Sequence, residues 1–202
     1  MMTEKGFTII GDYQTEKRMK QKREAIPLPD LKGKRVLDIG CDHGYWAHLA
    51  STLGASYVLG VDRGRVVRTK GHVRLAEQNN AQGWPNCKFV EHNLGEEWPD
   101  LGWFDVVFCF SVYHHWFPVA RSHDKVWKWL WEHTAPDGVV LWEGPPDTKD
   151  PFFRHRLAEE KLGTETFTRE LITEAAERYF NIEIVGPAIH RPHREVWRCS
   201  PR

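Results

Sequence analysis

One short stretch near the amino terminus places the strongest constraint on how this 202-residue chain can fold. It reads VLDIGCDHGYWA over residues 36–47 and follows a basic lead-in, KGKR, at residues 32–35. The pattern predicts an apolar strand that ends at Gly40, a tight loop, and a helix that begins near Gly44. A strand–loop–helix unit of this kind points backbone N–H groups and a helix amino terminus at a ligand. The stretch therefore predicts a ligand-binding loop at the start of an α/β domain.

The rest of the chain alternates between apolar strands and helical patterns. We expect strands at residues 35–39, 57–61, 88–91, 104–112, 139–143, 181–189 and 194–198, and helices at residues 15–26, 44–54, 65–78, 124–133 and 168–179. The unbroken run FDVVFCFSV suits a central parallel strand that is covered on both faces. The last two strands have no helix between them, which indicates an antiparallel hairpin. The chain therefore predicts an α/β fold, a seven-stranded and mostly parallel sheet with helices on both faces and an antiparallel C-terminal hairpin.

Composition and punctuation suggest one main domain with a small cap. Residues 15–26 have a weak apolar face and are ended by two prolines, so residues 1–31 are expected to form a helical cap on a domain at residues 32–202. The 28 basic and 28 acidic residues balance, although both ends of the chain are locally basic. The four cysteines form no C-x-x-C pair, and no apolar run could span a bilayer. These features predict a reduced, cytoplasmic protein without membrane association.

Polar residues follow the expected strands where a parallel sheet collects its ligands. Asp62 ends the second strand, 22 residues after Gly40, where a carboxylate can accept hydrogen bonds from both hydroxyls of a ribose. Arg63 beside it could lie over an adenine ring. Asn93 and the N–H of Leu94, just past the third strand, could pair with the adenine edge. Each residue alone is more typical of a turn or cap, but together and in this order they indicate an adenosine site.

The loop itself argues against a dinucleotide. A dinucleotide fingerprint requires G-x-G-x-x-G, but Asp42 and Tyr45 stand where the second and third glycines belong. A pyrophosphate would then face an acidic side chain. A sulfonium is positively charged, so Asp38 and Asp42 suit it electrostatically.

These residues resemble the motifs of class I S-adenosylmethionine (SAM) dependent methyltransferases. Residues 36–47 are similar to the first motif, D-x-G-x-G-x-G, and residues 104–115 and 135–141 to the fourth-strand motif and the turn into the fifth strand. The resemblance implies a Rossmann-like fold and SAM as cofactor. It also implies a set of cofactor-binding residues: Asp38, Gly40, Cys41, Asp42, Gly44, Tyr45, Asp62, Arg63, Asn93, Leu94, Phe110 and Ser111. The chain departs from the family at Asp42, usually glycine, and at Asn93, usually aspartate.

Methyl transfer from a sulfonium is an in-line displacement, so the protein mainly has to align donor and acceptor. A base is needed only if the acceptor must lose a proton. The candidates are His114, His115 and Glu143, and Tyr113 and Trp116 are further pocket candidates. A structural role for the histidine pair is an open alternative. We expect no metal, because no carboxylate-rich or Cys/His ligand spacing accompanies the histidines.

The acceptor is expected to be a small molecule, such as a sugar or a phosphorylated metabolite, methylated on O or N. No N-P-P-Y/F motif follows the fourth strand, and Cys109 lies within the strand rather than at a nucleophile position. Residues 145–167 are expected to be a loop whose prolines, aromatic and basic residues could form a lid, although an ordinary surface loop is equally compatible with them.

An RNA acceptor is the alternative, because two basic segments could form a phosphate track. The residues of that track are Lys17, Arg18, Lys20, Lys22, Arg23, Arg191, Arg194 and Arg198. The fold also resembles that of enzymes that act on tRNA wobble bases. A transferase that uses SAM for a group other than methyl is a third possibility. The sequence leaves the oligomeric state open.

Overall fold

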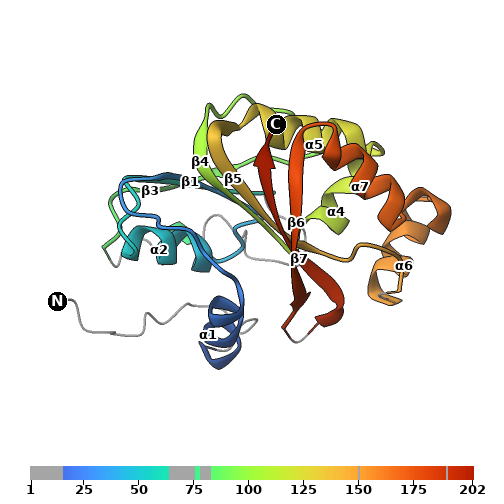
Figure 1. Ribbon diagram of the computed structural model, residues 1–202, viewed down its shortest axis with the longest axis horizontal. Helices are drawn as coiled ribbons and strands as arrows, with labels where there is room; N and C mark the ends of the chain where they lie inside the picture. Colours follow the sequence, from blue (N-terminus) through green and yellow to red (C-terminus); the bar gives the residue numbers. More distant parts are fainter. Residues whose placement is uncertain (1–15, 64–75, 78–82, 150, 190) are drawn as a thin grey trace.

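The structure, a computed structural model, describes residues 16–63, 76–77, 83–149, 151–189 and 191–202. Seven strands form one sheet in the order β3-β2-β1-β4-β5-β7-β6 (Figure 1). The strands are β1 (Arg35–Ile39), β2 (Tyr57–Asp62), β3 (Cys87–Glu91), β4 (Phe104–Phe110), β5 (Thr134–Gly144), β6 (Phe180–Ala188) and β7 (Arg191–Pro201). The first five pair in parallel, and β7 runs antiparallel to both β5 and β6. The predicted sheet and its C-terminal hairpin are therefore confirmed.

Helices cover both faces of the sheet because successive strand residues point to opposite sides. The helices are α1 (Glu16–Ala25), α2 (Tyr45–Thr52), α4 (Tyr113–Ala120), α5 (His123–Glu132), α6 (Pro151–Glu159) and α7 (Arg169–Glu177), with a 3₁₀ turn, η1 (Thr164–Thr166). Val36 of β1 faces a core shared with α2, and Leu37 faces a core shared with α4, α5 and α7. Figure 1 shows α5 and α7 together on the side of the sheet away from α2.

Several boundaries differ from the sequence prediction. The strand expected to reach residue 112 ends at Phe110, because Ser111 turns the chain with a φ of 59° and α4 begins two residues later. The sequence prediction missed α4, whose aromatic residues and internal Pro118 give a weak helical signal. It also missed α6, which lies where a loop was expected. The expected helix at residues 65–78 lies almost entirely outside the described residues.

A half-buried histidine, His123, joins α5 to η1 on the side of the sheet away from α2. Nε2 of His123 lies 2.9 Å from the carbonyl oxygen of Thr166, and Nδ1 lies 2.7 Å from the hydroxyl of Tyr113. Since a carbonyl only accepts, Nε2 carries the proton and Nδ1 accepts from the tyrosine. The ring also stacks on Phe117 with centroids 3.9 Å apart. Burial lowers the pKa of His123 to about 4, so the neutral ring is part of the fold.

This histidine should make the protein sensitive to acid. Between pH 6.5 and 4 the unfolded chain binds a proton at His123 that the folded chain excludes, so stability falls as pH falls. The loss between pH 7 and pH 5 should be about 2 kcal/mol. Urea unfolding of the wild type and of His123→Gln at both pH values measures it, and the difference between the two proteins should shrink by that amount. A pH dependence that is identical in both proteins would contradict the assignment.

Candidate functional site

The loop between β1 and α2 has the sharp turns that a close ligand approach requires. Gly40 and Gly44 have φ values of 69° and 84°, and Asp42 between them has 48°. Left-handed backbone is open to glycine and tolerated by aspartate, so Asp42 takes the conformation of the usual glycine. A Cβ atom on Gly40 would lie only 2.7 Å from Cγ2 of Val112, which follows β4. The departure at Asp42 therefore preserves the loop and its close contact with the end of β4.

Asp62 lies beside this loop at the carboxyl end of β2. Its Oδ2 accepts a hydrogen bond from the N–H of Asp42 at 2.8 Å, and its Oδ1 accepts one from the N–H of Arg63 at 2.8 Å. The N–H groups of Gly40 and Cys41 both donate to a carbonyl at the end of the same strand. A carboxylate has about four acceptor positions, so Asp62 can hold the loop and bond ribose hydroxyls as well.

Asp38 makes the floor of the loop acidic. It is 1% exposed, and its Oδ2 accepts the N–H of Ala47, in the first turn of α2, at 3.1 Å. Burial raises its pKa to about 7, and the charges of Asp62 and Asp42 add to the rise, while the bond from Ala47 and the charge of Lys22 oppose it. Three carboxylates gathered at one loop favour a positively charged ligand, so the donor set fits a sulfonium and an amino group better than a phosphate.

Cofactor binding should therefore depend on pH. A cation bound at the loop favours ionised Asp38, so binding releases a proton when the ligand-free pKa is about 7. SAM affinity should fall by roughly tenfold from pH 8 to pH 6. Calorimetry at both pH values measures it. The variant Asp38→Asn keeps an oxygen that accepts the N–H of Ala47 and should remove the pH dependence of SAM affinity. Its loss in this variant would assign the pH dependence to Asp38 rather than to nearby His43. Tighter binding at the lower pH would refute this linkage.

The predicted adenine contacts lie at the neighbouring strand ends. The N–H of His92 donates to the carbonyl of Asp62 at 2.9 Å, which ties the end of β3 to the end of β2. Asn93 begins a turn and is half-buried, as is Leu94, whereas Arg63 is exposed. These three residues therefore lie along the edge that carries Asp62, where the sequence placed them.

A second group of polar residues lies at the ends of β4 and β5. Glu143 is 2% exposed and accepts a hydrogen bond from the hydroxyl of Ser111 at 2.9 Å. The N–H of Ser111 also donates to the carbonyl of Glu143 at 2.8 Å. The left-handed backbone of Ser111 is uncommon for a residue other than glycine, and such strain often marks a functional site.

His114 joins this group through an arginine from β7. Its Nε2 lies 3.2 Å from Nη2 of Arg194, and Nη1 of the same guanidinium lies 4.0 Å from Oε1 of Glu143. A guanidinium only donates, so the Nε2 of His114 accepts and the ring proton is assigned to Nδ1. The ring of His115 is half-buried and lies 4.2 Å from that of His114. The structure thus brings His114 and Glu143 together and leaves His115 at the margin.

Helix α1 supplies a residue that the sequence did not assign to the site. Nζ of Lys22 lies 2.5 Å from Oε2 of Glu143 and 3.4 Å from Oγ of Ser111. The side chains of Lys22 and Arg194 are only 16% and 5% exposed. These two residues therefore point into the site, whereas the alternative of an RNA acceptor needs them on an exposed phosphate track. No local pattern separates Lys22 from the basic residues around it, so only the fold reveals its role.

Two further pocket candidates belong to the core. Tyr113 is fully buried and bonded to His123, and Trp116 packs between the rings of Trp98 and Trp129. The segment at residues 145–167, predicted as a loop that could be a lid or an ordinary surface loop, contains α6, and Phe153 of this helix is fully buried against the ring of Phe167.

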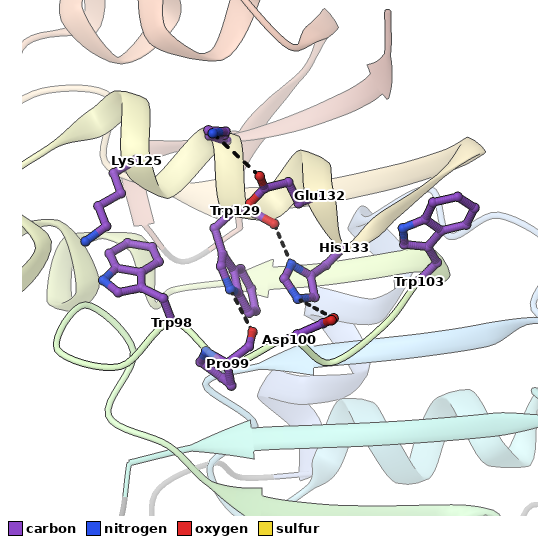
Figure 2. Close-up of a pocket in the computed structure, with 9 residues that line it drawn as sticks. Trp98, Pro99, Asp100, Trp103, Lys125, Trp129, Glu132 and His133 are labelled. Atoms are coloured by element: carbon purple, nitrogen blue, oxygen red, sulfur yellow. Dashed lines mark hydrogen bonds and ion pairs between the residues drawn. The ribbon is translucent and has the colours of Figure 1, made fainter.

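A pocket of about 470 Å³ lies beside α5, away from this site (Figure 2). Nζ of Lys125 lies 4.4 Å from the ring centroid of Trp98, and the indole of Trp129 donates to a backbone carbonyl. His133 is bonded on both ring nitrogens. The residues that line the pocket precede β4 or β5 in the chain, so they lie near the amino ends of these strands. The Gly40–Gly44 loop follows the carboxyl end of the parallel strand β1, so the pocket is at the opposite end of the strands.

Two features are absent from the described part of the chain. No group of three His, Cys, Asp or Glu residues there is arranged to hold a metal ion. No described helix combines the length and the apolar character that a membrane span needs.

Known proteins share this sequence pattern. The family of methyltransferase domains matches residues 12–179. The tRNA U34 carboxymethyltransferase of Campylobacter hominis is 41% identical over 91 residues, 44% of this chain and 30% of that protein. The same-named protein of Idiomarina loihiensis is 32% identical over 138 residues, 68% and 41% of the two chains. The ubiquinone biosynthesis O-methyltransferase of Neisseria meningitidis is 37% identical over 86 residues, 43% and 35% of the two. The chain thus spans between 30% and 41% of the length of these relatives.

Solved structures share the fold. A SAM-dependent methyltransferase from Mesorhizobium loti superposes with a TM-score of 0.65 at 17% identity, covering 91% of this chain and 96% of that one. A TehB-like SAM-dependent methyltransferase from Corynebacterium glutamicum gives 0.60 at 17% identity, covering 90% and 86%. Because the family match extends over most of the chain, the chain belongs to the methyltransferase domain family, which confirms the predicted class of SAM-dependent methyltransferases with SAM as cofactor.

Proposed function

We propose that this protein transfers a methyl group from SAM to an oxygen or nitrogen atom of a small molecule. The observation that carries the proposal is the buried group of Glu143, Lys22, Arg194 and Ser111 next to the cofactor loop. Charged side chains enclosed at this depth suit an acceptor that enters whole and replaces water with specific polar contacts. Bound SAM supplies an electrophilic methyl group, and the chain has to align the acceptor and exclude water.

We assign the cofactor to the loop from Asp38 to Tyr45, with Asp62 on the ribose and Asn93 and Leu94 on the adenine. The acidic loop and the left-handed Asp42 support this assignment. We propose Glu143 as the proton acceptor, because each carboxylate oxygen can accept a further hydrogen bond beside Lys22 and Ser111, whereas Arg194 occupies the single lone pair on Nε2 of His114. In this proposal His114 positions Arg194. We also propose that the predicted N-terminal cap, residues 1–31, covers the site through α1, since residues 1–15 lie outside the described residues.

RNA is the second candidate acceptor, and the names of two relatives favour it. These names refer to carboxymethyl transfer to tRNA. The third possibility, a transferase that uses SAM for a group other than methyl, is therefore grouped with the RNA candidate. The inward positions of Lys22 and Arg194 weaken the proposed phosphate track. A cytoplasmic location is part of the proposal in either case, and the burial of Cys41, Cys87, Cys109 and Cys199 as thiols supports it.

Transfer of labelled methyl from SAM to separated fractions of a cell extract tests the proposal. We expect label in the small-molecule fraction with the wild type and none with Asp62→Ala. Label found only in tRNA would replace the proposal with the second candidate. Label in neither fraction, despite SAM binding, would contradict methyl transfer to both acceptor classes.

A further inference from the structure

The ammonium of Lys22 lies among side chains that have the chemistry of a cation-binding site. Its Nζ is 5.8 Å from the ring centroid of Trp46 and 5.6 Å from that of Phe110. Glu143 and Ser111 complete the enclosure with a carboxylate and a hydroxyl. Aromatic faces attract cations through the ring quadrupole, and aromatic cages of this kind bind organic ammonium groups. We call these four residues, Trp46, Phe110, Ser111 and Glu143, the cation cage.

None of the four residues of the cation cage belongs to α1, the helix that supplies Lys22. Trp46 comes from α2, Phe110 and Ser111 from the end of β4, and Glu143 from β5. Trp46, Phe110 and Glu143 are 7%, 6% and 2% exposed, and the two rings lie 4.7 Å apart at 53°. Because these residues are packed on the sheet and α2, the cage keeps its shape whether or not a cation from α1 is present.

Helix α1, which supplies Lys22, is only weakly anchored to the rest of the domain. The sequence of α1, EKRMKQKREA, has no apolar stripe that would bury against the domain. Figure 1 shows α1 beneath α2 at the margin of the molecule. Ile26, just after the helix, is buried and holds its end. The Lys22 side chain can therefore leave the cage without disrupting the packing of the sheet.

We propose that the cation cage binds an ammonium group of a ligand, and that Lys22 occupies the cage as an internal substitute which that ligand displaces. The inference deepens the proposed function, on which it rests for the identity of the ligand. An ammonium can come from two sources at this site: the amino group of the methionine part of the cofactor, or an amine on the acceptor. Both sources compete with Lys22 for the same carboxylate and rings.

Removing the internal competitor tests this directly. The variant Lys22→Gln keeps the length of the side chain and removes its charge. Arg23→Gln is the matched control, because it removes the same charge from the exposed neighbouring position. S-adenosylhomocysteine is titrated into each protein by calorimetry, and methylammonium and 1,4-diaminobutane are then titrated in its presence and in its absence. Thermal unfolding shows that each variant is folded.

We expect Lys22→Gln to tighten binding of S-adenosylhomocysteine or of an amine by about tenfold, as expected for removing a charged competitor, while Arg23→Gln changes neither. Tighter binding of S-adenosylhomocysteine identifies the cofactor as the source of the ammonium. Tighter binding of an amine identifies the acceptor as the source. Unchanged or weaker binding of both ligand types in Lys22→Gln would overturn the proposal, because Lys22 would then be a bystander or a ligand-binding residue itself.

A second variant keeps the test decisive if Lys22→Gln does not fold. Phe110→Leu removes one aromatic face and keeps an apolar side chain, so it should weaken the ligand that the cage binds by several fold. Equal affinity in Phe110→Leu and the wild type would overturn the cage. The result is separable from the proposed function, because failure of the wild type to bind S-adenosylhomocysteine would refute the cofactor assignment, while the amine titration still judges the cage.

Discussion

Replacing Asp62 with alanine should weaken SAM binding by about thirtyfold or more, which is about 2 kcal/mol or more. Two losses combine in this variant. The ribose loses its charged acceptor, and the N–H of Asp42 loses the 2.8 Å hydrogen bond that holds the loop against β2. A charged hydrogen bond is worth more than a neutral one, and the loop is the surface that the ligand must meet. Calorimetry with SAM at pH 8 measures the effect.

The control for this variant is a carboxylate with a similar bond at the opposite edge of the sheet. Asp105, at the start of β4, accepts a hydrogen bond from the N–H of Arg35 at 2.7 Å. Asp105→Ala should reduce stability while leaving SAM affinity unchanged. If Asp62→Ala binds SAM as tightly as the wild type, the ribose assignment fails. If both variants lose affinity equally, the loss reflects general destabilisation.

Replacing Gly40 with alanine should destabilise the protein by about 2–4 kcal/mol and impair SAM binding with it. One part of this cost is the left-handed backbone, with a φ of 69°, which an alanine adopts unfavourably. The other part is steric, because the new Cβ would lie 2.7 Å from Cγ2 and 2.8 Å from Cβ of Val112. The Val112 backbone leads from β4 into α4, so it cannot move away without disturbing both. Urea unfolding measures the change in stability.

Two further variants separate the two costs. Gly102 has a φ of 77°, but a Cβ there would meet no atom within 4 Å, so Gly102→Ala should cost only about 1–2 kcal/mol for the backbone. Adding Val112→Ala to Gly40→Ala should recover part of the steric cost, although the smaller residue loses its own packing. Equal destabilisation by Gly40→Ala and Gly102→Ala would show that the contact between the two strand ends contributes nothing.

The parts of the fold that sequence predicted well are those with strong local periodicity. The run from Phe104 gives a buried strand because every residue except Asp105 is apolar, and β1, β2 and β3 are similarly clear. The terminal hairpin followed from two strand patterns with no helix between them. In contrast, α4 and α6 were missed because proline, histidine and aromatic residues carry weak helical propensity, and burial against the core decides their conformation.

The candidate site likewise has one part that the sequence predicted and one part that only the fold brings together. The loop after β1 and the acid that ends β2 are local motifs, so their positions could be read from spacing alone. Lys22 and Arg194 are 172 positions apart, and their shared partner Glu143 is far from both. Residues this distant in sequence meet only because β5 pairs with β7 and α1 lies across the strand ends. The sequence predicted His114 as a candidate base, whereas in the fold its ring is held by the guanidinium of Arg194.

The sequence by itself determined the class of this protein, because a glycine-containing loop and strand-end residues depend on backbone geometry that neighbouring residues impose. It also predicted the cofactor through its resemblance to SAM-dependent methyltransferases, and Asp38 and Asp42 suit a sulfonium better than a pyrophosphate. Only the tertiary structure decided which charged residues share the buried end of β5 and that a cation from the cap helix lies there. Those contacts join the two ends of the chain, and long-range proximity of this kind is a property of packing rather than of local sequence pattern.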